Sequence, residues 1–164
     1  MRAREIIGIL EGGTARWNEF RQDHPDGFVL NGASLQGAQL AEADLHSVIL
    51  MDSDLQRANL SAASLERAVL RKTNLGESDL RQANMNRADL FRANLAGADL
   101  REASLDSCFL KCADLRGADL STARGLTEAQ IAAAFGNELT RLPDGLARPA
   151  AWVSEIGSDE VRPD

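Results

Sequence analysis

The residues of this chain that could do chemistry are few and poorly grouped. It has two histidines, His24 and His46, and two cysteines, Cys108 and Cys112. Neither histidine has an evident serine or cysteine partner of the kind that nucleophilic catalysis uses. The C-x-x-x-C spacing of the cysteines comes without a second pair or a nearby histidine, so neither a zinc site nor a disulfide framework is expected. We therefore expect surface histidines, reduced structural thiols, no catalytic residue, no metal and no cofactor.

The carboxylates are numerous, but basic residues nearly balance them in the middle of the chain. The 164 residues carry 25 Asp and Glu against 18 Lys and Arg, which gives a net charge of -7. Residues 28–124 hold thirteen of these acidic residues against eleven basic ones, so most of the excess lies outside this segment. General binding to nucleic acid or to an anionic membrane needs a positive excess, which the chain lacks. The expected partner is therefore a protein.

The composition fits one domain that has no aromatic core. Hydrophobic residues make up 44% of the chain and aromatic residues only 4%, so Leu and Ala have to build the interior. Residues 1–13 contain no apolar run long enough for the hydrophobic part of a signal peptide. No stretch of about 18 uncharged apolar residues occurs elsewhere. The sequence predicts a cytoplasmic protein.

A five-residue repeat dominates the middle of the chain. Leucine occupies every fifth position from Leu30 to Leu120, with Met85 as the single replacement. Two residues before most of these positions stands a small side chain, mostly alanine, and the residue between is mostly Asp, Asn or Ser. The pattern A-(D/N)-L-x-x appears unmodified at 58–60, 88–90 and 98–100. Self-similarity at a fixed period is typical of repeat architectures.

A period of five fits neither a long helix nor a long strand. The leucines would walk around a helix, and in a strand an odd spacing would place successive leucines on opposite faces. Both difficulties disappear if the chain turns a corner once per repeat, so that each leucine and the small residue before it point to a common axis. The Asp or Asn between them then points outward beside the bend, where it can bond local backbone groups. The period therefore predicts a solenoid.

Over residues 28–122 these repeats resemble the pentapeptide-repeat family. The resemblance implies an all-β solenoid, namely a right-handed quadrilateral parallel β-helix with four pentapeptides per coil. The leucine and the preceding small residue would point inward. Because an uncovered terminal coil would offer an edge for further stacking, such a solenoid needs a cap at each end.

Both ends of the repeat segment, residues 28–124, have candidate caps. Residues 1–27 show helical spacing of apolar residues over 3–10 and 14–21. In residues 125–156, the sequence Thr127-Glu128-Ala129-Gln130 predicts a capping box that opens a short helix through Phe135. Four large apolar residues are expected to close the last coil: Leu126, Ile131, Phe135 and Trp152. The polar residues 157–164 are expected to be disordered.

One outer face of the expected solenoid carries most of the large apolar side chains. They are Val29, Ile49, Met51, Val69, Phe91 and Phe109. The same face holds Arg71, Lys72, Arg92 and Lys111 against Asp52 and Asp89, a positive balance. An apolar patch rimmed by charge usually marks a contact surface, so these residues are the candidate partner-binding site. Two interpretations stay open, because the face could pair with a second copy in a homodimer or be covered by the terminal segments.

A second face is relatively acidic and suggests an alternative function. Its carboxylates are Glu42, Asp79, Asp99, Glu102 and Asp119. Some members of the family, the quinolone-resistance proteins, resemble duplex DNA in shape and charge and bind DNA gyrase or topoisomerase IV. The resemblance therefore allows a DNA-mimicking ligand of a topoisomerase as the alternative. It ranks second because the leucine register runs without insertion and leaves no projecting loop of the kind that the plasmid-borne resistance proteins have.

Overall fold

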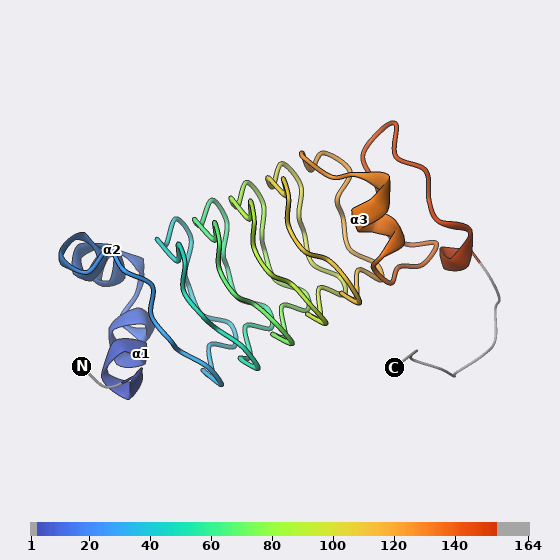
Figure 1. Ribbon diagram of the computed structural model, residues 1–164. Helices are drawn as coiled ribbons and strands as arrows, with labels where there is room; N and C mark the ends of the chain where they lie inside the picture. The colour runs from blue at the N-terminus through green and yellow to red at the C-terminus, as the bar shows by residue number, and fades with distance from the viewer. Residues whose placement is uncertain (1–2, 154–164) are drawn as a thin grey trace.

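The computed structural model describes residues 3–153 and shows a stack of coils with a helical segment at each end (Figure 1). The helices are α1 (Ala3–Glu11), α2 (Thr14–Asp23) and α3 (Glu128–Ala132), and the 3₁₀ helix η1 follows at Ala150–Trp152. The expectation for residues 157–164 lies outside the described residues, as do the last three residues of the expected C-terminal segment. None of the helices in the described part is long and apolar enough to cross a membrane.

Parallel bridges between single residues join each coil to the next. Every bridge that starts between Val29 and Ser104 links residues 20 positions apart. The bridges form four ladders, one on each side of the coil, which begin at Val29, Ser34, Gln39 and Asp44. Four pentapeptides therefore complete one coil, as the resemblance implies.

 The C-terminal segment enters two of these ladders at longer spacings, through Asp114 with Phe135 and through Asp119 with Arg141.

The corner of each repeat is a β-turn that starts at the leucine. In the turn after Leu40, the Ala43 N–H donates to the Leu40 carbonyl over 3.1 Å. The third residue of the turn, Glu42, has a left-handed backbone with φ of 61°, and the corresponding residue of every repeat from Gly32 to Gly117 has a positive φ. Such a backbone costs a non-glycine residue about 1 kcal/mol. An inter-coil hydrogen bond offsets this cost, since the Glu42 N–H donates to the Ser61 carbonyl over 2.8 Å.

The polar residue before each leucine supports the same corner from outside. The Asp54 carboxylate accepts a hydrogen bond from the Gln56 N–H at 3.0 Å, and the Asn94 side chain accepts one from the Ala96 N–H at 3.0 Å. Because the acceptor lies two residues before the donor, this contact holds the turn without help from another coil. It explains why Asp or Asn recurs at this position.

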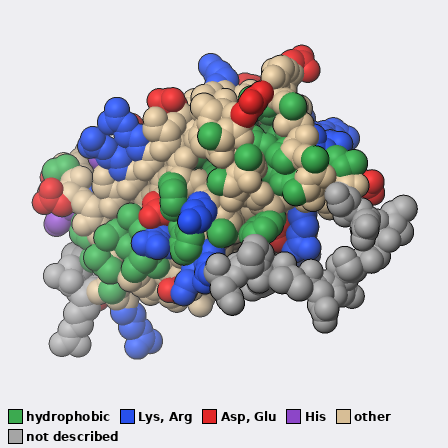
Figure 2. Space-filling model, turned by 45° about the vertical axis from the view of Figure 1, so that its right-hand side comes forward, with side chains coloured by type: hydrophobic (Ala, Val, Ile, Leu, Met, Phe, Trp, Pro, Cys, Tyr) green, Lys and Arg blue, Asp and Glu red, His purple; other side chains and the backbone are tan. Residues whose placement is uncertain are grey.

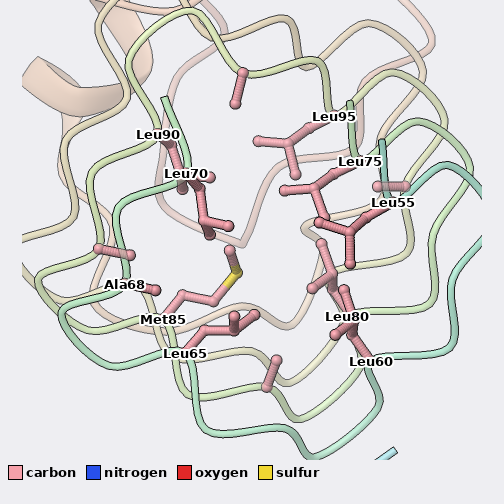
Figure 3. Packing of buried hydrophobic residues seen from close by; sticks show 14 of the residues in the cluster. Leu55, Leu60, Leu65, Ala68, Leu70, Leu75, Leu80, Met85, Leu90 and Leu95 are labelled. Atoms are coloured by element: carbon pink, nitrogen blue, oxygen red, sulfur yellow. The ribbon is translucent and has the colours of Figure 1, made fainter. Parts of the chain in front are cut away.

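Leucine and alanine side chains fill the interior of the stack (Figure 3). Leu55, Leu75 and Leu95 lie one above another on one side, and Met85 occupies a leucine position. Each buried leucine contributes roughly 1.5 to 3 kcal/mol relative to an exposed one. The few polar side chains inside are paired, since the Thr73 hydroxyl donates to the Leu50 carbonyl over 2.7 Å.

At the N-terminal end, side chains of α2 bind backbone groups that a further coil would otherwise satisfy. The Trp17 indole N–H donates to the Asp44 carbonyl over 2.7 Å, and the Asn18 amide donates to the Glu42 carbonyl over 2.9 Å. Trp17 is fully buried against the first coil. The edge of the first coil is thereby covered by a helix, which blocks further stacking.

Arg21 is the charged part of this cap. Its side chain is 2% exposed and lies 3.3 Å from the Asp44 carboxylate, which is 44% exposed. The guanidinium also donates to the carbonyls of His24, Asp26 and His46. One buried cation therefore joins α2, the chain that leaves it and the first coil.

At the C-terminal end, α3 begins as the sequence predicts but ends earlier. Thr127 and Gln130 form the capping box, and the Gln130 side chain also donates to the Cys108 carbonyl over 2.9 Å. The expectation that the helix continues through Phe135 is wrong. The Phe135 N–H donates to the Ala113 carbonyl and its carbonyl accepts from the Leu115 N–H, so the residue joins a ladder instead.

The residues expected to close the last coil differ in burial for the same reason. Ile131 is fully buried and Trp152 is 7% exposed, with its indole N–H donating to the Ala134 carbonyl over 3.1 Å. Leu126 is partly buried against the core. Phe135 is 39% exposed, because the ladder position that it occupies points outward.

The inward register can be tested at Leu75. Leu75→Ala should lower the free energy of unfolding by about 2 to 5 kcal/mol, because it leaves a cavity in the stack. Leu75→Asp should prevent soluble folding, since it buries an unpaired charge. Gln56→Asp, an outward control, should change the stability by less than about 0.5 kcal/mol. Urea unfolding measures all three, and equal tolerance at the two positions would contradict the register.

The N-terminal cap can be tested at Arg21. Arg21→Met keeps the length of the side chain but removes every donor, so it should destabilise the fold by about 3 kcal/mol. Arg16→Met, on the exposed side of the same helix, is the matched control and should change the stability by less than about 0.5 kcal/mol. Urea unfolding followed by tryptophan fluorescence compares the two. Equal stabilities would show that the guanidinium contacts do not hold the cap.

Candidate protein-interaction surface

The ladder that begins at Val29 brings together the apolar side chains predicted to share one side. It runs from Val29 through Ile49, Val69 and Asp89 to Phe109. The residues that follow it at the adjoining corner include Met51, Phe91 and the four basic residues Arg71, Lys72, Arg92 and Lys111. We call this surface, made of the six apolar residues named in the sequence analysis and these four basic ones, the apolar-basic face.

An aromatic cluster with two arginines lies toward the C-terminal end of the apolar-basic face. The rings of Phe91 and Phe109 are stacked with their centroids 6.2 Å apart. The guanidinium of Arg71 lies 4.9 Å from the Phe91 centroid, and that of Arg92 lies 5.3 Å from it. Arg71 also stands 3.8 Å from the Asp89 carboxylate. These contacts place two guanidinium groups against the Phe91 ring, beside Phe109.

The sequence contained a signal for this cluster that simple motif searching misses. Arg71 and Phe91 are 20 positions apart, so the coil length places one directly above the other. Phe109 lies on the ladder and Phe91 at the corner beside it, which no fixed spacing along the chain would suggest. Aligning the sequence in rows of 20 residues reveals the contact between Arg71 and Phe91.

The apolar-basic face is open to solvent over the part of the chain that the structure describes. Val29 is 57% exposed and Phe109 is 50% exposed at its two ends. A shallow hollow between them is lined by Met51, Phe91 and the charged residues Asp52, Arg71 and Lys72. Figure 2 shows one side of the molecule on which apolar side chains lie among Lys and Arg side chains. The helices α1 and α2 lie at the N-terminal end of the stack (Figure 1).

The acidic ladder is in register but is closely paired with arginines. Asp79, Asp99 and Asp119 stack directly through parallel bridges. Arg81 lies 2.6 Å from the Asp79 carboxylate, and Arg101 lies 2.6 Å from that of Asp99. The remaining two carboxylates of the predicted acidic face lie apart from these pairs. Glu102 accepts a hydrogen bond from the Gln82 amide, and Glu42 belongs to the corner that binds the N-terminal cap.

The pairing changes the acidity of the ladder. Hydrogen bonds from Arg81 and Arg101 lower the pKa values of Asp79 and Asp99. Burial acts to raise the pKa of Asp119, but hydrogen bonds from Ser121 and the charge of Arg141 outweigh it, so this pKa is also lowered. The three carboxylates therefore stay charged at neutral pH. Their field is offset locally by the arginines.

The histidines and cysteines have structural contacts. The His24 ring stacks on Phe20 at 4.2 Å between centroids, and the His46 ring is hydrogen-bonded to the Ser47 hydroxyl. Cys108 is buried in an alanine position, and burial raises the pKa of its thiol to about 12. Such a thiol is unreactive near neutral pH. Cys112, at a corner next to Lys111, is partly exposed.

Comparison with solved structures gives relatives of the same architecture. A pentapeptide repeat protein of the Arabidopsis thaliana thylakoid lumen is 28% identical, with a TM-score of 0.62 over 66% of this chain and 78% of that one. The pentapeptide repeat protein Rfr23 of the cyanobacterium Cyanothece 51142 is 27% identical, with a TM-score of 0.57 over 76% of this chain and 97% of that one. The plasmid-mediated fluoroquinolone resistance protein QnrB1 is 17% identical with a TM-score of 0.38, a likeness too low to bear on function.

Comparison of sequences identifies the family. No curated protein matches the chain. The family model of pentapeptide repeats matches residues 26–57, 49–87 and 83–121, which together cover more than half of the chain. These matches span the leucine register and the four bridge ladders described above. The chain belongs to the pentapeptide-repeat family.

Proposed function

We propose that this chain is a non-catalytic protein-binding module that presents the apolar-basic face to a protein partner. The right-handed quadrilateral β-helix implied by the resemblance is the scaffold for this surface. The observation that carries the proposal is the exposure of Val29 and Phe109, at 57% and 50%, on the ladder that also holds Ile49 and Val69. Large apolar side chains gathered on one side of a folded chain usually mark a contact surface.

The composition of the face supports binding to a protein. Aromatic and arginine side chains are enriched among the residues that contribute most to protein interfaces. Phe91, Phe109 and Arg71 are such residues, and their mutual contacts limit their freedom before a partner arrives. A surface ordered in advance loses less conformational entropy on binding.

The charge of the face favours an acidic partner over a second copy of the chain. Four basic residues stand against Asp52 and Asp89, which leaves the face with a net charge of +2. A two-fold homodimer would bring two such faces together, and like charges placed opposite each other oppose association. An acidic segment with apolar residues would instead meet complementary groups.

The interior of the stack supports a non-catalytic role. Leucine, alanine and a few small polar residues occupy the inward positions of the described coils. Substrate binding inside the coil would require this packed core to open. Recognition is therefore assigned to the outer surface.

The alternative function, a DNA-mimicking ligand of DNA gyrase or topoisomerase IV, has weaker support. The register of Asp79, Asp99 and Asp119 supplies stacked carboxylates, but Arg81 and Arg101 lie within ion-pair distance of two of them. A DNA mimic needs a strongly negative surface, and these pairs reduce the negative potential.

The aromatic part of the proposed surface is tested by Phe91→Ala combined with Phe109→Ala. Proteins that the unmodified chain retains from an extract of the source organism should be lost by this variant. Truncation of central aromatic residues typically costs 2 kcal/mol or more, which is about a thirtyfold loss of affinity. The control is Leu139→Ala, because Leu139 is 68% exposed outside the apolar-basic face. Equal retention by both variants would contradict the proposal.

The charge of the surface is tested by Lys72→Glu. Lys72 and Arg87 both occupy the left-handed position of a corner, with φ of 57° and 59°, so Arg87→Glu is a matched control for the backbone and for the charge change. We expect Lys72→Glu to weaken binding of the same proteins and Arg87→Glu to leave it unchanged. If the partner is a second copy, sedimentation will instead show a concentration-dependent dimer.

The alternative function is tested by a DNA gyrase supercoiling assay. Because the acidic ladder is neutralised by neighbouring arginines, we expect no inhibition by the unmodified chain at micromolar concentration. Inhibition that disappears when Asp79, Asp99 and Asp119 are changed together to Asn would contradict this expectation and favour the alternative function.

A further inference from the structure

We propose that residues 154–164 of this chain dock on the apolar-basic face and compete there with its protein partner. The inference rests on the proposed function, because it uses the same surface, and it names an occupant for that surface.

The described chain ends beside one end of the apolar-basic face. The Trp152 indole N–H donates to the Ala134 carbonyl over 3.1 Å. The neighbouring Ala133 carbonyl accepts a hydrogen bond from the Cys112 N–H over 2.8 Å. Cys112 follows Lys111, one of the four basic residues of the face. The segment after Val153 therefore starts close to the C-terminal edge of this surface.

The remaining segment is long enough to cross the face. The ladder from Val29 to Phe109 contains four coil-to-coil steps. At about 4.8 Å per step it extends about 19 Å. Eleven residues follow Val153, and in an extended conformation they reach about 36 Å. The segment can pass from Val153 onto the face with residues to spare.

The chemistry of the segment complements that of the face. Residues 154–164 contain four acidic residues against the single basic residue Arg162, and they include Ile156 and Val161. The acidic residues are Glu155, Asp159, Glu160 and Asp164. The face offers the opposite arrangement, a positive balance around exposed apolar side chains. Electrostatic and apolar contacts would therefore form together.

Tethering makes this contact effective even if each interaction is weak. A segment attached close to its binding site acts at an effective concentration in the millimolar range. A partner must displace the docked segment. The apparent association constant of the face for the partner is therefore the intrinsic constant multiplied by the fraction of molecules in which the segment is not docked. The segment would thus set a threshold for partner binding.

A nitroxide placed in the segment tests this contact directly. The label is attached through Ser158→Cys in a chain that also carries Cys112→Ser, so that the partly exposed Cys112 thiol takes no label. The remaining thiol, Cys108, is buried and does not react under native conditions. Methyl NMR signals of Ile49 and Val69 report on the face, and those of Leu139 report on a surface outside it. We expect stronger paramagnetic broadening at Ile49 and Val69 than at Leu139.

The matched control keeps the label and removes the charges through Glu155→Gln, Asp159→Asn and Glu160→Gln. This variant should lose the preferential broadening, as should the unmodified segment at an ionic strength of about 1 M, where the Debye length is about 3 Å. Equal broadening at all three residues, or broadening at the face that vanishes on dilution, would overturn docking within one chain.

The two proposals can fail separately. The methyl signals of Ile49 and Val69 could show no preferential broadening while the variant with Phe91→Ala and Phe109→Ala still fails to retain the partner. In that case only the docking of residues 154–164 is wrong. If that variant and its control retain the same proteins, the proposed function itself is wrong. Where both proposals hold, the variant with Glu155→Gln, Asp159→Asn and Glu160→Gln should bind the partner severalfold more tightly than the unmodified chain.

Discussion

The structure depends on the hydrogen bonds that join each coil to the next while leucine fills the space between them. The Leu40 N–H donates to the Asn59 carbonyl, and the Glu42 N–H at the corner donates to the Ser61 carbonyl. These bonds stabilise left-handed corners at ordinary residues, which would be strained elsewhere. Because the coil length is fixed, every outward side chain has a defined neighbour in the next coil. The outer faces therefore have a fixed register from coil to coil.

This constraint has different consequences for the two faces with functional candidates. On the acidic ladder, the residue two positions after Asp79 and Asp99 is an arginine that binds the carboxylate, so charges are offset within the same repeat. On the apolar-basic face, Arg71 and Arg92 lie against the Phe91 ring, and within residues 3–153 Arg71 is the basic side chain of this face that forms an ion pair, with Asp89. On the acidic ladder, neighbouring arginines offset the carboxylates. The apolar-basic face instead keeps a positive surface around its apolar side chains.

The repeat allowed the architecture to be predicted because five-residue spacing has no solution in a single helix or strand. The inward positions of Leu75 and Cys108 and the support of the corners by Asp and Asn follow from that spacing. The C-terminal cap was harder to predict, because Phe135 could either extend α3 or join a ladder, and only the position of the Ala113 and Leu115 backbone groups decides this. The stacking of Phe91 on Phe109 depends on side-chain geometry across a corner, which the sequence does not encode as a spacing.

A protein partner that binds the apolar-basic face should lie against Phe109. The most direct measurement replaces Phe109 by the photoreactive amino acid p-benzoylphenylalanine and, in a second protein, replaces Leu139 in the same way, followed by irradiation in an extract of the source organism. Mass spectrometry should identify the same acidic protein cross-linked through position 109 in repeated experiments, and no such product from position 139. Cross-links of equal yield at the two positions, or from position 139 alone, would contradict the account.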